Sequence, residues 1–427
     1  MMNSGFHSPA RPHLVWFYTG SPFHNLDAAT WLKTTHELRQ LGWQVTLVTT
    51  GPAGRQVVQG VEVFCIPKPD VYFLRQLIFH LKALWLIFRM RNTTDVLLFH
   101  QLSAPWFIFL WIAQRLTGRN KPLLVMDTRD VNRVYVSLKN RLRARFIKFG
   151  HWLANRWADG QLAITPRMAR LVQIPSQKLW GTWPSGVNLE QFSPAAARRR
   201  WPANGEPLHL IYTGSMDCDR NLMSICQAVE KANNANMNFV LSLFGAGTER
   251  PTLEKFALGT TGRIHVMPPV SHHQVPELLA QAHIGVAGLA LLDDKIFEAS
   301  SPVKLFEYMA AGLPVLCSRS ACYTEVVGDG EFAFWIESTS QDGLLAALRL
   351  IWQNRYVLPR MGQEAAEAAK AWTWTEAAKK MKAALENGLA RFAQARSLSP
   401  QVRQPSLPQT KEMNLQQFDI SAGHNTF

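Results

Sequence analysis

Short apolar runs alternate with amphipathic stretches along the first part of the chain. Residues 13–18 predict a strand, residues 28–41 an amphipathic helix and residues 44–50 a second strand. This order is typical of the start of a doubly wound parallel sheet in an α/β protein. The loop at Gly20, after the first strand, either approaches a ligand closely or forms an ordinary turn between strand and helix.

Polar residues follow two further apolar runs. Residues 95–99 and 122–126 predict buried strands, with His100 directly after the first and Asp127, Arg129 and Asp130 after the second. Doubly wound sheets bind their ligands at the carboxyl ends of the strands, so these residues are candidates for a ligand-binding site. The alternative is that an aspartate and an arginine pair only to hold a loop.

Two predicted helices in this part of the chain are basic. Residues 74–91 place apolar side chains at helical spacing with Arg and Lys between them, and residues 141–157 carry five further cations. The first pattern suits a helix that lies on an anionic membrane surface, or a core helix whose cations reach out to solvent. The apolar stretch 102–113 is too short to cross a bilayer, and we expect no membrane span.

The second half repeats the alternation and ends it with a distinctive segment. Strands are predicted at residues 208–212, 239–244, 264–267 and 284–289. Residues 303–311 then predict a helix that is stopped by Gly312 and Pro314 and followed by a strand at 315–318. Lys304 lies at the helix N-terminus, where free N–H groups and the helix dipole favour phosphate. Glu307, one turn later, could accept hydrogen bonds from sugar hydroxyls, or form a surface ion pair with Lys304.

The amino-acid sequence of residues 302–315 resembles the donor-site segment of GT-B glycosyltransferases of family 4, also called glycosyl transferases group 1. In that family the helix N-terminus faces a nucleotide diphosphate, and the second Glu of a Glu-x7-Glu pattern holds the ribose. Glu307 matches the second Glu. The first, which contacts the transferred sugar in the family, falls at Ala299 and is absent here.

Other segments of the second half resemble the same family. The loop of Gly214 and Ser215 is similar to one that holds the diphosphate with two cations; Arg220 matches one cation, and Ser215 stands at the place of the other. The resemblance implies one set of donor-binding residues: Gly214, Ser215, Arg220, Gly245, Val266, Ser301, Pro302, Val303, Lys304 and Glu307. Among them, Arg220, Lys304 and Glu307 would act in catalysis: the two cations would stabilise a leaving diphosphate, and Glu307 would fix the ribose.

The resemblance implies a GT-B fold, with two Rossmann-like doubly wound domains facing a cleft. Residues 1–195 would bind the acceptor and residues 206–371 the nucleotide sugar, residues 372–395 would form a helix that crosses back onto the first domain, and residues 396–427 are expected to be a disordered tail. The implied reaction is retaining transfer of a sugar from a nucleotide diphosphate sugar to an acceptor hydroxyl, without a metal or another cofactor. The alternatives are an inverting transferase and an inactive binding protein, the latter suggested by Ala299 and Ser215.

Charge and cysteine content bear on partners and location. The formal net charge is +14, which suits phosphorylated substrates, an anionic membrane or nucleic acid, but no module for specific nucleic-acid binding is present. Five cysteines without metal-type spacing, and no apolar signal in residues 1–12, favour a cytoplasmic protein. We therefore expect a lipid-linked glycan acceptor at the inner face of the plasma membrane, in bacterial cell-surface polysaccharide or lipid-linked glycan assembly.

Overall fold

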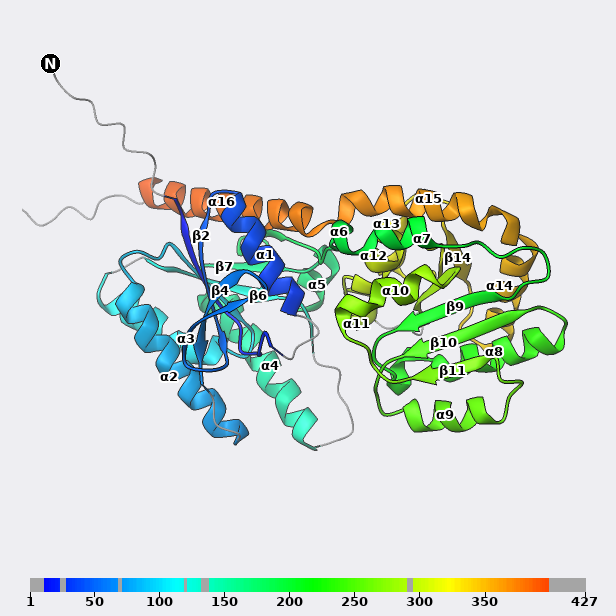
Figure 1. The fold of residues 1–427 in the computed structure, drawn as a ribbon. Helices are drawn as coiled ribbons and strands as arrows, with labels where there is room; N and C mark the ends of the chain where they lie inside the picture. Colours follow the sequence, from blue (N-terminus) through cyan, green and yellow to red (C-terminus); the bar gives the residue numbers. More distant parts are fainter. Residues whose placement is uncertain are drawn as a thin grey trace, which may run out of the picture. The chain divides into compact units, whose positions relative to one another are not determined.

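Two β-sheets organise the chain in the computed structural model (Figure 1). The structure describes residues 11–23, 28–67, 71–118, 121–131, 138–289 and 295–398. Both sheets are built from parallel strands joined through helices, apart from one antiparallel edge pair. The predicted α/β architecture with doubly wound sheets is therefore confirmed.

The first sheet has eight strands in the order β3-β4-β2-β1-β5-β6-β7-β8. Their bounds are β1 His13–Phe17, β2 Gln44–Thr50, β3 Gly54–Val58, β4 Val61–Ile66, β5 Val96–His100, β6 Leu123–Thr128, β7 Gly160–Ala163 and β8 Leu179–Thr182. The antiparallel hairpin of β3 and β4 turns at Gln59 and Gly60, which both have positive φ, as a type I′ turn requires. The sequence analysis did not predict this hairpin.

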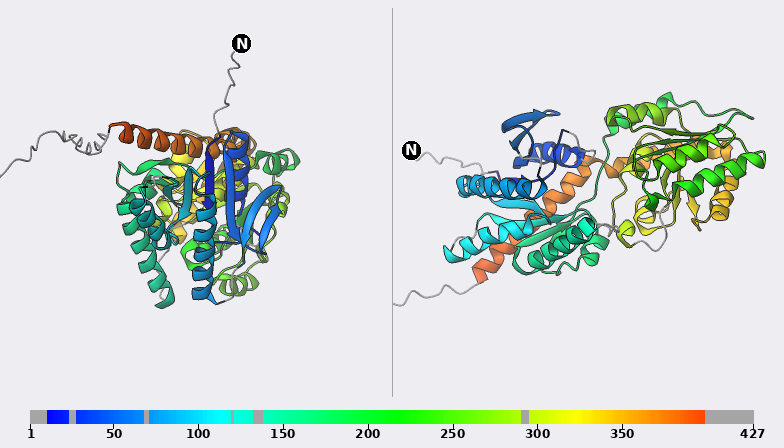
Figure 2. Two further views of the ribbon diagram at one scale, coloured as in Figure 1. Left: turned by 90° about the vertical axis from the view of Figure 1, so that its left-hand side faces the viewer. Right: turned by 90° about the horizontal axis from the view of Figure 1, so that it is seen from below.

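Three helices cover one face of the first sheet. They are α2 Tyr72–Met90, α3 Ala104–Leu116 and α4 Leu138–Trp157, while α1 Ala28–Gln40 and α5 Pro166–Leu171 complete this part of the chain. Phe79 of α2, Phe107 of α3 and Trp157 of α4 share one buried cluster with Phe17 and Phe99 of the strands. Figure 2 shows these helices from two further directions. Their inner sides are thus fixed by a common core, which leaves their outer sides to the surface.

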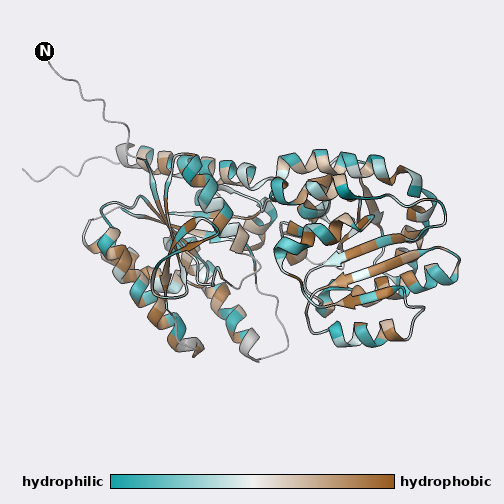
Figure 3. Cartoon of the chain, in the orientation of Figure 1, coloured by the Kyte–Doolittle hydropathy of each residue, from teal (hydrophilic) through white to brown (hydrophobic). Residues whose placement is uncertain are grey.

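The second sheet has six parallel strands in the order β11-β10-β9-β12-β13-β14. Its strands are β9 Leu208–Thr213, β10 Phe239–Phe244, β11 Ile264–Met267, β12 Ile284–Gly288, β13 Val315–Ser318 and β14 Ala333–Ile336. Its helices are α8 Leu222–Asn234, α9 Arg250–Leu258, α10 Val275–Ala280, α11 Lys295–Glu298, α12 Val303–Ala310, α13 Ala321–Val327, α14 Gln341–Gln353 and α15 Leu358–Ala368. Counted from β9, the strand order is 3-2-1-4-5-6, that of a Rossmann sheet. Figure 3 shows its strands as predominantly hydrophobic.

The segment between the sheets contains two short helices, α6 Leu189–Phe192 and α7 Pro194–Arg198. The stretch between the two predicted domains, residues 196–205, is tied to the second half by Arg199, whose buried guanidinium donates to the carbonyls of Leu279, Ala282 and Gly312. Three donated bonds satisfy a group that would be costly to bury alone. The division into domains at this segment stays a prediction.

The last helix is α16, Trp374–Leu398, and the unit that contains both sheets ends within it, at Gly388. Up to that residue it lies against β8, because a Cβ on Gly181 would come 2.6 Å from the Cβ of Ala384. The helix therefore contacts the first sheet, while its assignment as a crossing between two domains stays a prediction. Of the predicted tail, residues 396–398 belong to α16, and residues 399–427 lie outside the described residues. Within the described part of the chain, no helix has both the length and the apolar character to cross a membrane.

Candidate functional site

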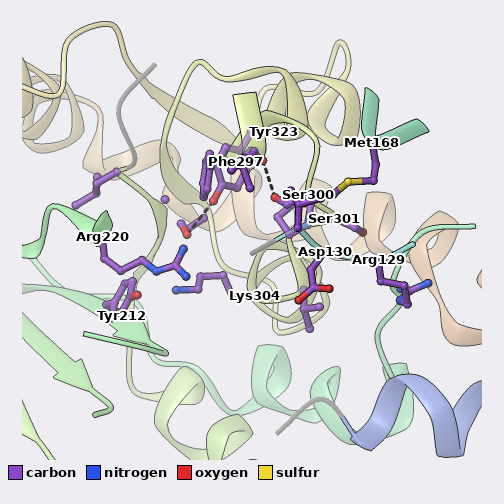
Figure 4. A pocket seen from close by; sticks show the side chains of 17 residues that line it. Arg129, Asp130, Met168, Tyr212, Arg220, Phe297, Ser300, Ser301, Lys304 and Tyr323 are labelled. Carbon is purple, nitrogen blue, oxygen red and sulfur yellow. Dashed lines mark hydrogen bonds between the residues drawn. The ribbon is translucent and has the colours of Figure 1, made fainter. Parts of the chain in front are cut away.

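A cavity of about 410 Å³ opens where the strand order of the second sheet reverses, between β9 and β12 (Figure 4). Tyr212 of β9 and Gly288 of β12 both contribute to its wall. The size is that of an ordinary small-molecule site, and the position is where open α/β sheets bind ligands. The charged side chains among its lining residues are Arg129, Asp130, Arg220 and Lys304, so the cavity is basic.

The N-terminal end of α12 supplies one wall of this cavity. Ser301, Pro302, Val303 and Lys304 all line it, as their place in the predicted phosphate site requires. Pro302 is the N-cap residue rather than the first helical residue, and the helix starts at Val303. The free N–H groups of the first turn and the positive end of the helix dipole lie at this end.

Lys304 is held beside an aromatic ring. Its Nζ atom lies 3.7 Å from the centre of the Tyr212 ring, a cation–π contact. Burial, together with the neighbouring Arg220, lowers the pKa of Lys304 to about 7, although Glu307 acts in the opposite direction. An anionic ligand in the cavity would favour the charged form of this lysine, since opposite charge offsets both effects.

Arg220 is the second cation of the cavity and points toward the same region as Lys304 (Figure 4). It ends a single 3-10 turn, and its Nε donates to the Ser215 Oγ at 3.0 Å. Ser215, where the family pattern has a cation, therefore positions the guanidinium of Arg220. The loop itself is fixed by Tyr212, whose hydroxyl donates to the Ser215 carbonyl at 2.6 Å.

Two predicted glycines lie beneath the cavity without lining it. A Cβ on Gly214, whose φ is +145°, would come 2.9 Å from the Lys304 Nζ. A Cβ on Gly245 would come 1.8 Å from the Gly214 carbonyl oxygen. The Gly214 position favours glycine because of its positive φ, and the Gly245 position because the loops after β9 and β10 pass each other at backbone contact. Val266 is half-buried on β11 and also lies outside the cavity wall.

Glu307 is buried one turn into α12 and does not line the cavity. Its Oε1 atom lies 2.7 Å from the Nε2 of His272, a residue that the sequence analysis missed. The hydrogen bond that His272 donates to the Glu307 carboxylate raises the pKa of His272, although burial opposes it. The available signal was position: His272 follows β11, so it lies near the carboxyl edge of the same sheet.

The acceptor-side candidates from the first sheet separate into two groups. Arg129 and Asp130 line the cavity; Arg129 lies 3.7 Å over the Trp183 ring and donates to the Ser185 Oγ at 3.0 Å. His100 pairs with Asp130, at 3.4 Å between the Nε2 and Oδ1 atoms.

Asp127 and Gly20 do not reach the cavity wall. Asp127 is buried and accepts a hydrogen bond from the Trp183 Nε1 at 3.0 Å; burial raises its pKa to about 6. The carbonyl of Gly20 accepts a hydrogen bond from the Thr50 N–H. In this structure both residues support neighbouring backbone or side chains.

Ala299, at the place of the missing first Glu, is buried in an apolar cluster with Ala163, Ile164 and Met168. Its carbonyl accepts a hydrogen bond from the Thr165 Oγ1 at 2.7 Å. The position contributes packing in this chain, and a carboxylate there would have to be buried among apolar side chains, which is costly.

Comparisons with known proteins place this geometry in a family. Residues 195–372 match the model of glycosyl transferases group 1, and residues 28–174 match that of the glycosyl transferase 4-like domain. D-inositol 3-phosphate glycosyltransferase of Streptomyces avermitilis is 26% identical over 208 residues, 45% of this chain and 43% of that protein. The chain thus spans about half the length of the curated relatives it matches.

Solved structures match over nearly the whole chain. Sucrose-phosphate synthase from Thermosynechococcus elongatus has a TM-score of 0.67 at 16% identity, covering 91% of this chain and 100% of that one. Anabaena HepE in complex with UDP-glucose has a TM-score of 0.62 at 12% identity, covering 90% and 99%. Two family models in succession along the chain, and a common fold across its length, show that this protein belongs to glycosyl transferases group 1 and has the GT-B fold.

Proposed function

We propose that this protein transfers a sugar from a nucleotide diphosphate sugar to an acceptor hydroxyl, with retention of the anomeric configuration. The observation that carries the proposal is the convergence of Lys304, Arg220 and the N-terminus of α12 on one cavity. A departing nucleoside diphosphate gains negative charge as the glycosidic bond breaks. Fixed cations and backbone N–H groups stabilise that charge without having to reorganise.

The donor-site roles follow from the same arrangement. The diphosphate would lie between the α12 N-terminus and the two cations, and Glu307 would accept hydrogen bonds from the ribose. We also propose that no metal ion is needed, because Lys304, Arg220 and the helix dipole supply the positive charge. The complex of Anabaena HepE with UDP-glucose supports the class of donor.

For the acceptor we propose a lipid-linked glycan at an anionic membrane surface, with the protein on the inner face of the plasma membrane. The supporting observation is that α2, α3 and α4 contain no Asp or Glu and expose large apolar side chains, Trp85 and Phe88 of α2 among them. Such a surface fits the interfacial region of a bilayer. Assembly of a bacterial surface glycan is the process that this acceptor would serve.

The test is a thermal-shift titration with UDP, GDP and ADP and their sugars. Saturation at about 100 times Kd adds about 2.7 kcal/mol of stability, so the correct nucleotide should raise Tm measurably. We expect Lys304→Met to lose most of that rise. Lys295→Met, which removes an exposed cation from the neighbouring α11, should keep it. No rise with any nucleotide would contradict the proposal.

Turnover then tests the reaction itself. NMR of the product of transfer or of slow donor hydrolysis should show the donor's own anomer at the moment of release, and excess EDTA should leave the rate unchanged. An inverted anomer would instead support an inverting transferase.

A second candidate is a GT-B protein that binds a nucleotide sugar without transferring it. The apolar surroundings of Ala299 favour it, since the carboxylate that the family directs at the transferred sugar is absent. Nucleotide binding without hydrolysis or transfer, in the presence of extracted lipid acceptors, would support this candidate.

A further inference from the structure

The imidazole of His272 and the carboxylate of Glu307 form a pair that the family resemblance did not supply. The two residues lie 35 positions apart, His272 in a 3-10 turn after β11 and Glu307 on α12, and their Nε2 and Oε1 atoms are 2.7 Å apart. The Glu307 side chain is 11% exposed, whereas the His272 side chain is 42% exposed. A hydrogen bond to a carboxylate at this distance is of the strong, charge-assisted kind.

His272 is itself held in place. The turn that carries it starts with a capping box at Ser271, and the Gln191 Nε2 donates to the His272 carbonyl at 3.2 Å. The ring also lies 5.5 Å from the Phe192 ring, and its Nδ1 faces the Gln191 Nε2 at 3.5 Å. An amide nitrogen only donates, so Nδ1 acts as acceptor and Nε2 carries the proton donated to Glu307.

The two carboxylate oxygens of Glu307 differ in their hydrogen bonding. Within the described part of the chain, Oε1 accepts the bond from His272, and no bond to Oε2 occurs. A carboxylate whose rotation is fixed by one partner presents its other oxygen in one direction. Ordering a free side chain costs conformational entropy. Because the Glu307 side chain is already ordered, a hydroxyl group can bond to this oxygen without that cost.

We infer that His272 is a positioning residue that makes the donor site selective for ribonucleotides over 2′-deoxyribonucleotides, by fixing the Glu307 carboxylate against the ribose 2′-hydroxyl. The inference rests on the proposed function, because it needs a nucleotide at this site. His272, although it lies outside the cavity wall, would thus contribute to the selectivity for the donor.

The test compares matched pairs of nucleotides by isothermal titration: UDP with dUDP, GDP with dGDP and ADP with dADP. For the pair that binds, we expect the wild type to prefer the ribonucleotide about tenfold or more, the size of one hydrogen bond to a charged group. His272→Ala should weaken ribonucleotide binding and leave deoxyribonucleotide binding almost unchanged, so the preference falls about fivefold or more. His272→Gln, which keeps an N–H donor, should restore part of it.

Two controls separate positioning from a general structural effect. His273→Ala alters the exposed neighbouring histidine and should keep the preference. In the Glu307→Ala background, adding His272→Ala should have no further effect, because the carboxylate it positions is gone. Equal weakening of both nucleotides by His272→Ala, or no change in either, would overturn the inference. If no nucleotide binds the wild type, the proposed function fails instead.

Discussion

At the scale of a single residue, Lys304 links donor binding to protons. Its pKa is about 7 in the free protein because burial and Arg220 disfavour the charged form. A bound diphosphate favours that form, so above pH 7 binding should take up protons and affinity should fall as pH rises toward 9. Titration at pH 8 in two buffers of different ionisation enthalpy measures the uptake. At pH 8 we expect the protein to take up a sizeable fraction of one proton for each nucleotide bound. The phosphate groups are already ionised at that pH, so the proton is taken up by the protein.

The same shift fixes the sign of the stability change. The pKa of Lys304 in the folded protein lies below its ordinary value of 10.5, so between about pH 7 and pH 10.5 the unfolded chain binds more protons at this residue. Its contribution to the free energy of unfolding therefore rises with pH across that window.

Lys304→Met should abolish the proton uptake on binding, and Lys295→Met should not. Equal uptake in both variants would assign the proton to another group.

At the scale of the element, the contact between the loops after β9 and β10 sets how far the donor site tolerates change. In Gly245→Ala the new Cβ would stand 1.8 Å from the Gly214 carbonyl oxygen, so the loop that carries Ser215 and Arg220 must move. Overpacking of this kind costs about 1–3 kcal/mol. We expect that loss in urea unfolding, together with weaker binding of the diphosphate.

A glycine at the end of a helix gives the matched control. Gly259, which caps the C-terminus of α9, has φ −90°, and a Cβ there would lie 3.5 Å from the nearest atom. Gly259→Ala should leave stability and affinity close to those of the wild type. If Gly245→Ala binds the diphosphate as well as the wild type does, the Gly214 loop is less important to the site than its contacts indicate.

The elements also show what the sequence could and could not predict. Strands with long apolar runs were predicted closely; β10 was predicted with its observed bounds, Phe239–Phe244, because five of its six residues are apolar. The β3–β4 hairpin was missed because its edge strand alternates exposed and half-buried positions with few apolar side chains. Lys304 was predicted from its place at a helix N-terminus, and Arg220 from the resemblance of its loop to the family's diphosphate loop.

Residues whose role depends on distant partners were not found in this way. The role of His272 depends on Glu307, and the burial of Asp127 depends on Trp183, 56 residues later in the chain. No local pattern encodes either contact. Such contacts arise only when the strand order brings two loops to one edge of a sheet.

At the scale of the whole molecule, the outer sides of α2, α3 and α4 form a surface of unusual composition. Trp85 is 57% exposed, Phe109 63% and Trp152 50%, although each helix buries its inner side in one shared core. Arg89 lies 4.8 Å from the Trp85 ring and Arg156 4.4 Å from the Trp152 ring. Aromatic rings next to cations, without acidic residues on these helices, fit the boundary between lipid headgroups and acyl chains.

This surface predicts reversible, salt-sensitive binding to anionic vesicles. Full-length protein should sediment with vesicles that contain phosphatidylglycerol at low salt, and much less with phosphatidylcholine alone or at 1 M salt, where the Debye length falls to about 3 Å. Trp85→Ser combined with Trp152→Ser should reduce the bound fraction strongly, because each exposed ring contributes apolar area to the interface. Leu258→Ser combined with Tyr356→Ser removes two exposed apolar side chains from other elements and should leave binding unchanged. If both double variants bind as the wild type does, these helices do not make the contact, and the acceptor need not be presented at a membrane.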